Sequence, residues 1–195
     1  MHVSAIVLAA GRGRRMGQDK ALLELGGRTS IQRVVGACVE GGAATVTVVR
    51  RAADRELPAD VRAAVAVVRA ARTDEMIESL RLAARRLPRA AEAVLVFPVD
   101  YALVEGPVVA AMVALLARGA AVALPLWQDR PGHPIGLARG LAPEIETART
   151  LRDVVARDPT RVEAAPVDSP WILRDLDTPE DLSAARAWLE DGRSP

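Results

Sequence analysis

The sequence contains few of the residues that mark several common classes of protein. It has one cysteine, Cys38, among 195 residues, which excludes a disulfide framework and a cysteine metal cluster. Cys38 is therefore expected to pack on the apolar side of a helix. Aromatic residues make up 3% of the chain, which argues against the base-stacking surfaces of proteins that bind single-stranded nucleic acid.

The sequence also lacks an excess of charge of one sign. Lysine and arginine number 26 and aspartate and glutamate 25, so the chain has no overall basic field for nucleic acid or for a membrane surface. No apolar run is long enough to span a bilayer, and the amino terminus leads directly into a predicted strand instead of a signal peptide. We therefore expect a cytoplasmic protein that has neither nucleic acid nor membrane as a partner.

What is present is the pattern of an α/β domain. Half of the residues are hydrophobic, and the length suits one compact domain but is short for two. Strands are expected at 3–8, 44–49, 65–69, 93–97, 120–126 and 162–167, and helices at 30–40, 74–87, 106–116, 150–156 and 179–189. This alternation predicts a three-layer α/β/α domain with a mainly parallel sheet over residues 1–190, followed by a frayed tail at 191–195.

A glycine-rich, cationic loop follows the first predicted strand. It contains Gly11, Gly13 and Gly17 together with Arg12, Arg14, Arg15 and Lys20. The strand is apolar throughout, as expected of a strand buried on both faces of a parallel sheet, and the loop leaves its carboxyl end, where open α/β sheets bind ligands. Glycines allow backbone N–H groups to face an anion, and the cationic side chains neutralise it, so this loop predicts a polyphosphate ligand.

Two familiar phosphate-binding motifs do not describe this loop. In a P-loop the lysine is preceded by glycine and followed by serine or threonine, whereas Lys20 is followed by Ala21. A dinucleotide fingerprint requires a glycine at the position of Met16. A plain basic turn closing a βα unit is the alternative, and the joint presence of glycines, cations and a buried strand argues against it.

The segment from Leu8 to Lys20 resembles the signature of a known family. Leu8, Ala9, Ala10, Gly11, Gly13, Arg15, Met16, Gly17 and Lys20 match the Leu-Ala-Ala-Gly-x-Gly-x-Arg-Met-Gly-x-x-Lys pattern of the MobA-like NTP transferases. The segment is most similar to the molybdenum cofactor cytidylyltransferase (MocA-like) branch. The resemblance implies a Rossmann-like sheet of the nucleotide-diphospho-sugar transferase type. It also implies that the loop wraps the triphosphate of an NTP, with Arg15 and Lys20 as catalytic residues that stabilise charge on the α-phosphate and on departing pyrophosphate.

A first candidate metal ligand follows the strand predicted at 93–97. Asp100 is expected to face the same crevice as the loop, where Mg²⁺ would join a carboxylate to phosphate oxygens. A bare aspartate after a strand can also be a helix cap or turn residue. The family pattern Asp-x-Pro-Leu-Val implies the catalytic metal ligand, although Asp100-Tyr101-Ala102-Leu103-Val104 lacks its proline.

A second candidate metal ligand precedes the last predicted helix. Thr178 as cap, Pro179 at the first helical position and Asp181 form a sound helix start, which explains these residues structurally. This helix start does not explain Asp177, which directly precedes the cap. The resemblance to the family pattern Asp-x-Asp-Thr-Pro-Glu-Asp-Leu implies that Asp177 is the second ligand, and we expect Asp175 to hold the loop.

A further nucleotide contact is suggested by the helix predicted at 74–87. Met76, Ser79 and Leu80 match a family segment that contacts base and ribose, while Glu75 replaces its glycine and Arg69 a nearby asparagine. Ser79 is therefore a candidate nucleotide-binding residue, alongside Leu8, Ala9, Ala10, Gly11, Gly13, Arg15 and Lys20. The alternative is that its hydroxyl serves only the helix backbone.

One histidine is a candidate for the acceptor site. His133, between Gly132 and Pro134, resembles a family segment that borders the pocket for the second substrate. A rigid turn is the alternative. A catalytic base is not required, because an attacking phosphate is already anionic at neutral pH. Arg50 and Arg51, at the end of the second predicted strand, are expected to be solvated.

Taken together, the resemblance implies transfer of CMP from CTP to molybdopterin with Mg²⁺ as cofactor and release of pyrophosphate. A molybdoenzyme is a candidate partner. CTP is favoured because Ala10 stands where guanylyl-transferring relatives carry glycine. The alternatives are GTP as donor, a sugar-phosphate or alcohol-phosphate acceptor, and a nucleotide-binding regulatory domain without turnover. Departures from the family pattern at Arg69, Glu75, Tyr101 and Ala102 favour the last, and retention of Arg15, Lys20, Asp100 and Asp177 argues against it.

Overall fold

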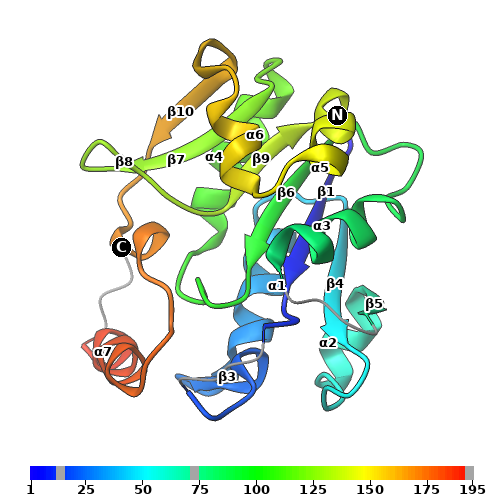
Figure 1. Ribbon diagram of the computed structural model, residues 1–195. Helices are drawn as coiled ribbons and strands as arrows, with labels where there is room; N and C mark the ends of the chain where they lie inside the picture. Colours follow the sequence, from blue (N-terminus) through cyan, green and yellow to red (C-terminus); the bar gives the residue numbers. More distant parts are fainter. Residues whose placement is uncertain (12–15, 71–74, 192–195) are drawn as a thin grey trace.

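The computed structural model describes residues 1–11, 16–70 and 75–191, which form a mixed, mainly parallel sheet between two layers of helices (Figure 1). The strands follow the order β10-β7-β9-β6-β1-β4-β5, and β8 pairs with β7. They are β1 (Val3–Leu8), β4 (Thr45–Arg51), β5 (Ala66–Ala70), β6 (Ala93–Pro98), β7 (Val122–Trp127), β8 (Arg130–Pro131), β9 (Ile135–Ala138) and β10 (Val162–Pro166). A separate hairpin joins β2 (Glu24–Leu25) to β3 (Arg28–Thr29). The predicted three-layer fold is confirmed.

Helices cover both faces of the sheet. On one side lie α1 (Ser30–Glu40), α2 (Ala59–Ala64) and α4 (Gly106–Ala117), and on the other α3 (Met76–Ala84), α5 (Ala142–Thr147) and α6 (Leu151–Ala156). The last helix, α7 (Pro179–Glu190), packs beside the β2–β3 hairpin. Four short 3₁₀ helices complete the chain: η1 (Lys20–Leu22), η2 (Arg139–Leu141), η3 (Pro159–Arg161) and η4 (Pro170–Leu173).

The centre of the sheet is β1, which is buried along its whole length. It pairs in parallel with β4 and β6, so that Val7 lies between Val48 and Phe97. Its alternate side chains enter two different cores: Ala5 and Val7 pack with α1 and α4, whereas Ile6 and Leu8 pack with α3 and α5. A strand with apolar partners on both faces requires the continuous apolar run seen in the sequence.

The chain order creates a ligand-binding position beside β1. From β1 the chain moves outward to β4 and β5, then returns to the other side of β1 to form β6. This change of direction is the topological switch point of an open α/β sheet, and ligands bind there outside the carboxyl ends of the strands. The segments that follow β1 and β6 are therefore neighbours at this edge.

The sequence pattern did not predict several of the short elements. The strand β9 runs antiparallel between β6 and β7, and α2 and α5 are single short helices. In β9, Gly136 faces Ala123, and a Cβ added to the glycine would lie 2.9 Å from the Ala123 Cβ. The close approach of the two strands at this point requires glycine, which in the sequence reads as a strand breaker.

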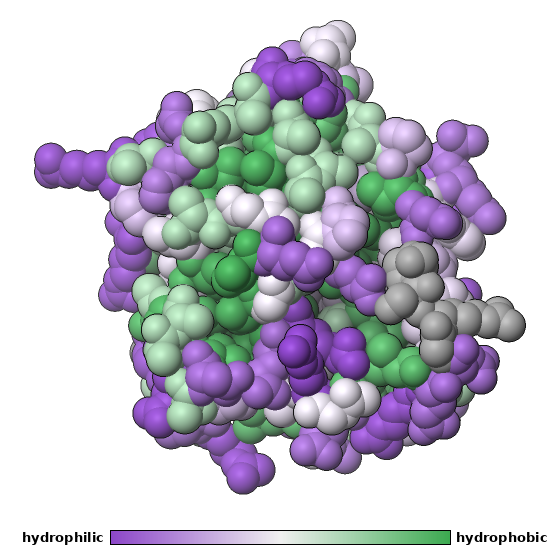
Figure 2. Space-filling model, turned by 180° about the vertical axis from the view of Figure 1, so that it is seen from behind, coloured by the Kyte–Doolittle hydropathy of each residue, from purple (hydrophilic) through white to green (hydrophobic). Residues whose placement is uncertain are grey.

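The helix layer behind the sheet contains the chain's one cysteine. Cys38 is fully buried in α1, as predicted, and burial raises the pKa of its thiol to about 12. Seen from this side, hydrophobic residues gather mainly over the upper and left parts of the surface and hydrophilic residues over its lower part and rim (Figure 2). Among the described residues, no helix combines the length and the apolar character needed to cross a bilayer.

Candidate active site

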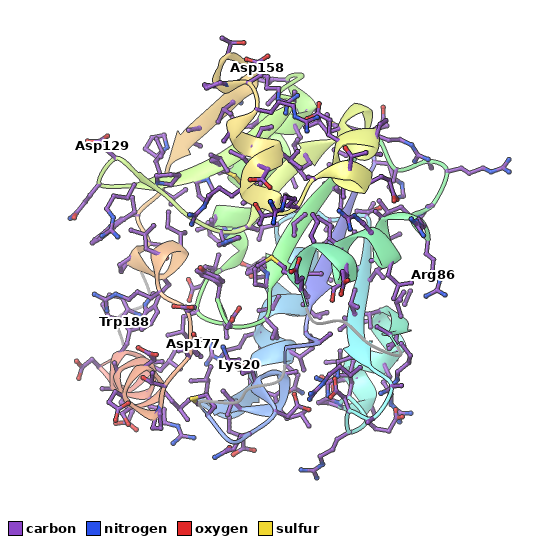
Figure 3. All side chains as sticks on the ribbon, in the orientation of Figure 1. Lys20, Arg86, Asp129, Asp158, Asp177 and Trp188 are labelled. Atoms are coloured by element: carbon purple, nitrogen blue, oxygen red, sulfur yellow. The ribbon has the colours of Figure 1, made fainter. Side chains whose placement is uncertain are left out.

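Three segments that are distant in the sequence bring charged side chains together at the switch point. Lys20 lies in η1 after β1, Asp100 follows β6, and Asp177 precedes α7. The Lys20 Nζ donates a hydrogen bond to Asp100 Oδ2 at 3.1 Å and a second one to Asp177 Oδ1. Figure 3 shows Lys20 and Asp177 beside each other near this edge of the sheet. The structure thus assembles three of the predicted site residues.

Lys20 is positioned by the first turn of η1. The carboxylate of Asp19 caps this turn by accepting a hydrogen bond from the Ala21 N–H at 3.2 Å. The Leu22 N–H also donates to the Asp19 carbonyl, at 2.9 Å. Because the lysine lies inside a capped turn, its backbone is fixed while its long side chain reaches the two aspartates.

Asp100 and Asp177 are joined through the backbone as well. The Leu176 N–H donates to the Asp100 carbonyl at 3.0 Å, which ties the last motif to the end of β6. The Asp181 carboxylate accepts from the N–H groups of Asp177 at 3.1 Å and Thr178 at 2.8 Å. The helix start that we expected at Thr178 is confirmed, and it also fixes the backbone of Asp177.

The prediction that Arg50 and Arg51 are solvated is wrong. Arg50 is fully buried, and its guanidinium donates to both carboxylate oxygens of Asp19, at 2.9 and 2.5 Å, and to the Ala9 carbonyl at 3.1 Å. Arg51 is half-buried and donates to Asp54 at 2.7 Å. The strand β4 runs two residues beyond the predicted end at residue 49, which carries Arg50 beneath the glycine-rich loop. A buried guanidinium is tolerated because these acceptors bind its two terminal nitrogens.

Asp175, which was expected to hold the loop, lies with the two predicted metal ligands. One carboxylate oxygen from each of Asp100, Asp175 and Asp177 lies within 4.8 Å of the others, which forms a group of acidic ligands within the described residues. Partial burial, together with the charge of Asp177, raises the pKa of the Asp175 carboxyl. The signal in the sequence was the Asp-x-Asp spacing, which places two carboxylates on one extended segment.

The charge of Lys20 balances part of this acidic group. Burial alone would lower the pKa of the Lys20 ammonium, but the opposite charges and hydrogen bonds of Asp100 and Asp177 outweigh it and raise the pKa. Lys20 is therefore a cation throughout the neutral range. Carboxylate oxygens are the ligands that Mg²⁺ and Mn²⁺ prefer, so the donor atoms of this group fit the divalent ion implied by the sequence resemblance.

The beginning of the glycine-rich loop is attached to both neighbouring strands. The Ala9 N–H donates to the Val49 carbonyl at 3.0 Å, and the Leu8 carbonyl accepts from the Val99 N–H at 3.0 Å. Leu8, Ala9 and Ala10 are buried and Gly11 is exposed. The predicted nucleotide-binding residues Gly13 and Arg15 lie outside the described residues. Ser79 is buried in α3, and its contact with a nucleotide stays a prediction.

His133 lies in a cavity next to the acidic group. The cavity measures about 820 Å³, and Tyr101, which follows Asp100 directly, also lines it. The ring centroids of Tyr101 and His133 are 4.5 Å apart. Burial lowers the pKa of His133 to about 4, while burial and the nearby carboxylates raise the pKa of Tyr101 to about 12. Both rings are therefore neutral at pH 7, and the role of His133 in binding the acceptor stays a prediction.

Comparison with known proteins agrees with this arrangement. Residues 5–174 match the family described as the MobA-like NTP transferase domain. Over 53 residues the chain is 51% identical to a protein named "Probable molybdenum cofactor guanylyltransferase" from Opitutus terrae, a stretch that covers 27% of this chain and 26% of that protein. The aligned stretch thus spans about a quarter of this relative's length.

Solved structures share the fold over nearly the whole chain. The crystal structure of Rv0371c from Mycobacterium tuberculosis H37Rv in complex with manganese has a TM-score of 0.77 and 22% identity, and the match covers 96% of this chain and 98% of that one. The 4-diphosphocytidyl-2C-methyl-D-erythritol synthase of Anaerococcus prevotii has a TM-score of 0.77 and 16% identity, with 97% and 96% covered. At these identities the likeness shows the fold alone. Since the family match extends from β1 to the segment before Asp175, the chain belongs to the MobA-like NTP transferase family.

Proposed function

We propose that the protein transfers a nucleoside monophosphate from an NTP to a phosphorylated acceptor, and that the acceptor is molybdopterin. The observation that carries this proposal is the meeting of Lys20 with Asp100 and Asp177 at the switch point, next to the glycine-rich loop. A cation and a group of carboxylates from three segments, at the edge where α/β sheets bind ligands, suit phosphoryl chemistry. The names of the curated relatives support the acceptor.

In the proposed reaction an oxygen of the acceptor phosphate attacks the α-phosphorus of the NTP. A new P–O bond forms, the bond from the α-phosphorus to the bridging oxygen breaks, and the electron pair leaves with pyrophosphate. The attacking phosphate carries no proton that must be removed, so no general base is needed. Lys20 is suited to bind the α-phosphate and the departing pyrophosphate, because it stays charged and its side chain reaches the acidic group.

The carboxylates complete the proposed machinery. Asp100 and Asp177, with Asp175 beside them, would hold a divalent ion. Bound there, Mg²⁺ or Mn²⁺ would neutralise charge on the α-phosphate and help to orient the acceptor. The manganese complex of the related fold supports the choice of ion. The chain must also bind both substrates. The buried start of the loop is available for the NTP, and the cavity at His133 is available for the acceptor.

The nucleobase is the open choice in this proposal. Ala10 favours CTP, by the family resemblance described above, and the cytidylyl product in the name of the Anaerococcus prevotii enzyme is consistent with it. The guanylyltransferase names of the curated relatives favour GTP. We propose CTP as donor, with GTP as the alternative.

One assay tests both parts of the proposal. Pyrophosphate release is measured with each of the four NTPs and Mg²⁺, with and without molybdopterin isolated from a molybdoenzyme. We expect release that depends on molybdopterin and is fastest with CTP. Release with GTP and with no other NTP would show that GTP, and not CTP, is the donor. Binding of an NTP without release under any condition would instead favour a regulatory domain, and a panel of sugar and alcohol phosphates would then test the other acceptors.

A further inference from the structure

Arginines without a partner gather around the cavity that contains His133. Arg130, Arg149 and Arg152 line it, and none of their side chains makes an ion pair or hydrogen bond with another residue in the described part of the chain. Arg130 comes from β8, and the other two flank the start of α6. The cavity therefore has three guanidinium groups, contributed by two separate segments, that have no partner among the described residues, and Glu75 is its one acidic lining residue among those described.

Two glutamates near the cavity are paired with other arginines. Arg161 forms an ion pair with Glu144 at 2.7 Å, and Arg85 one with Glu146 at 2.7 Å. Both glutamates belong to α5, the helix just before Arg149. The carboxylates of this region are thus already paired with other arginines, and the cationic groups of the cavity are left available for an anion from outside the chain.

The part of the cavity around Tyr101 and His133 is uncharged, in contrast to the part lined by the arginines. Both rings are neutral at pH 7, and the His133 Nδ1 is buried without a hydrogen-bond partner in the described structure. The cavity is otherwise largely apolar, with Ile77, Leu124, Ile135, Val155, Ile172 and Leu173 among the lining residues. An unpaired buried ring nitrogen is costly, and a bound ligand with a complementary polar edge would satisfy it.

We propose that this cavity holds the body of the acceptor, and that Arg130, Arg149 and Arg152 bind a second anionic group, distinct from the phosphate that attacks the NTP. The inference rests on the proposed function. Lys20, Asp100 and Asp177 are not among the residues that line the cavity, so the three arginines and the proposed reaction centre belong to neighbouring but different parts of the site. The preferred acceptors are therefore molecules with an apolar, hydrogen-bonding body and two anionic groups.

Protection of arginines from chemical modification tests the proposal without turnover. The protein reacts with p-hydroxyphenylglyoxal, and peptide mass spectrometry follows each arginine with and without molybdopterin. At about ten times its dissociation constant, molybdopterin should slow modification of the three cavity arginines by about tenfold. Arg86 is the internal control, because it is exposed and points away from the site in Figure 3. Equal rates at the cavity arginines with and without molybdopterin would overturn the proposal.

Kinetics of variants give a second test. In the double variant Arg149→Ala and Arg152→Ala, the KM for molybdopterin should rise at least about tenfold while the KM for the NTP is unchanged, since charged hydrogen bonds to the acceptor are lost. The lysine versions of both substitutions should recover part of the loss, and Arg86→Ala should match the wild type. A rise in both KM values, or in neither, contradicts the assignment.

The two proposals fail in different ways. If molybdopterin protects the arginines but no NTP releases pyrophosphate, the cavity assignment stands and nucleotidyl transfer is wrong. If transfer occurs but the arginines are neither protected nor needed, transfer stands and the second anionic subsite is wrong.

Discussion

At the scale of single residues, the central feature is that Lys20 occupies the space between two carboxylates that suit a divalent ion. The ammonium forms hydrogen bonds with both Asp100 and Asp177, and its side chain is 14% exposed. A lysine in this position competes electrostatically with any cation that approaches the same oxygens. It would be released when the phosphates of an NTP offer it new acceptors, so ion and nucleotide should bind together more readily than the ion alone.

This competition predicts an unusual effect of neutralising Lys20. In Lys20→Gln, the affinity of the nucleotide-free protein for Mn²⁺ should rise at least about tenfold, because a positive charge is removed beside the ligands. Pyrophosphate release should be lost. Electron paramagnetic resonance of free Mn²⁺ measures the affinity. Lys20→Arg keeps the charge and should bind Mn²⁺ as weakly as the wild type, whereas equal or weaker binding by Lys20→Gln would contradict the competition.

Arg50 is the residue whose role the sequence concealed. In the sequence alone, Arg50 is a charged residue at the end of a predicted strand, a position where most arginines face solvent. Its burial follows from two later facts: β4 is longer than its apolar run, and Asp19 returns from the loop to accept both guanidinium hydrogen bonds. A contact across 31 positions in the sequence cannot be inferred from periodicity.

Replacing Arg50 should therefore be costly for stability. Arg50→Met leaves Asp19 and the Ala9 carbonyl without their main partner, and breaking a buried ion pair typically costs about 3–5 kcal/mol. Because 20% of the Asp19 side chain is exposed, water can recover part of this, and we expect a loss near 3 kcal/mol in urea unfolding. Arg86→Met serves as the exposed control. A loss below about 1 kcal/mol would show that the pair is not a structural anchor.

At the scale of elements, two helices of this chain begin in the same way but have different neighbours. Thr178 and Thr150 each form a capping box, with Asp181 and Asp153 three residues later. In α7 the same Asp181 carboxylate also accepts from the Asp177 N–H, at 3.1 Å. The start of α7 therefore positions a candidate metal ligand, while Thr150 lies at the rim of the cavity in a segment without such a ligand.

The two caps form a matched pair for experiment. Thr178→Ala and Thr150→Ala should each lower the free energy of unfolding by about 1 kcal/mol, the usual cost of a lost helix cap. The Mn²⁺ affinity should fall in Thr178→Ala alone, because the Asp177 backbone is released with the cap. Urea unfolding and Mn²⁺ titration by electron paramagnetic resonance measure the two effects. Equal Mn²⁺ affinity in both variants would show that the cap does not position Asp177.

The elements also show what a sequence can and cannot reveal. The long apolar strands and amphipathic helices were predictable because their periodicity depends on the residues themselves. The strand β9 was not, because it has four residues, contains Gly136, and is defined by its partners β6 and β7. Likewise, Lys20, Asp100 and Asp177 could be named from motifs, but the inclusion of Asp175 and the free arginines of the cavity depended on tertiary packing.

At the scale of the whole molecule, the question is whether α7 unfolds with the rest. The helix lies at the edge of the molecule in Figure 1, yet it supplies Leu182 and Ala185 to the core shared with α1 and α4. The rings of Trp188 in α7 and Trp171 in η4 meet edge to face, with centroids 5.7 Å apart. These contacts favour one cooperative unit, and the single domain over residues 1–190 stays a prediction that unfolding can test.

If α7 unfolds together with the rest of the chain, the unfolding curves from two different spectroscopic signals should coincide. Tryptophan fluorescence reports the contact between α7 and η4, and far-ultraviolet circular dichroism reports all helices, so both should give the same urea midpoint and the same slope. Trp188→Phe identifies the part of the fluorescence change that comes from α7. If the fluorescence transition of the Trp171–Trp188 pair precedes the loss of helix signal, α7 opens separately. Because Asp177 and Thr178 stand at the base of this helix, such an opening would also remove Asp177 from Lys20, and local stability would then limit formation of the site.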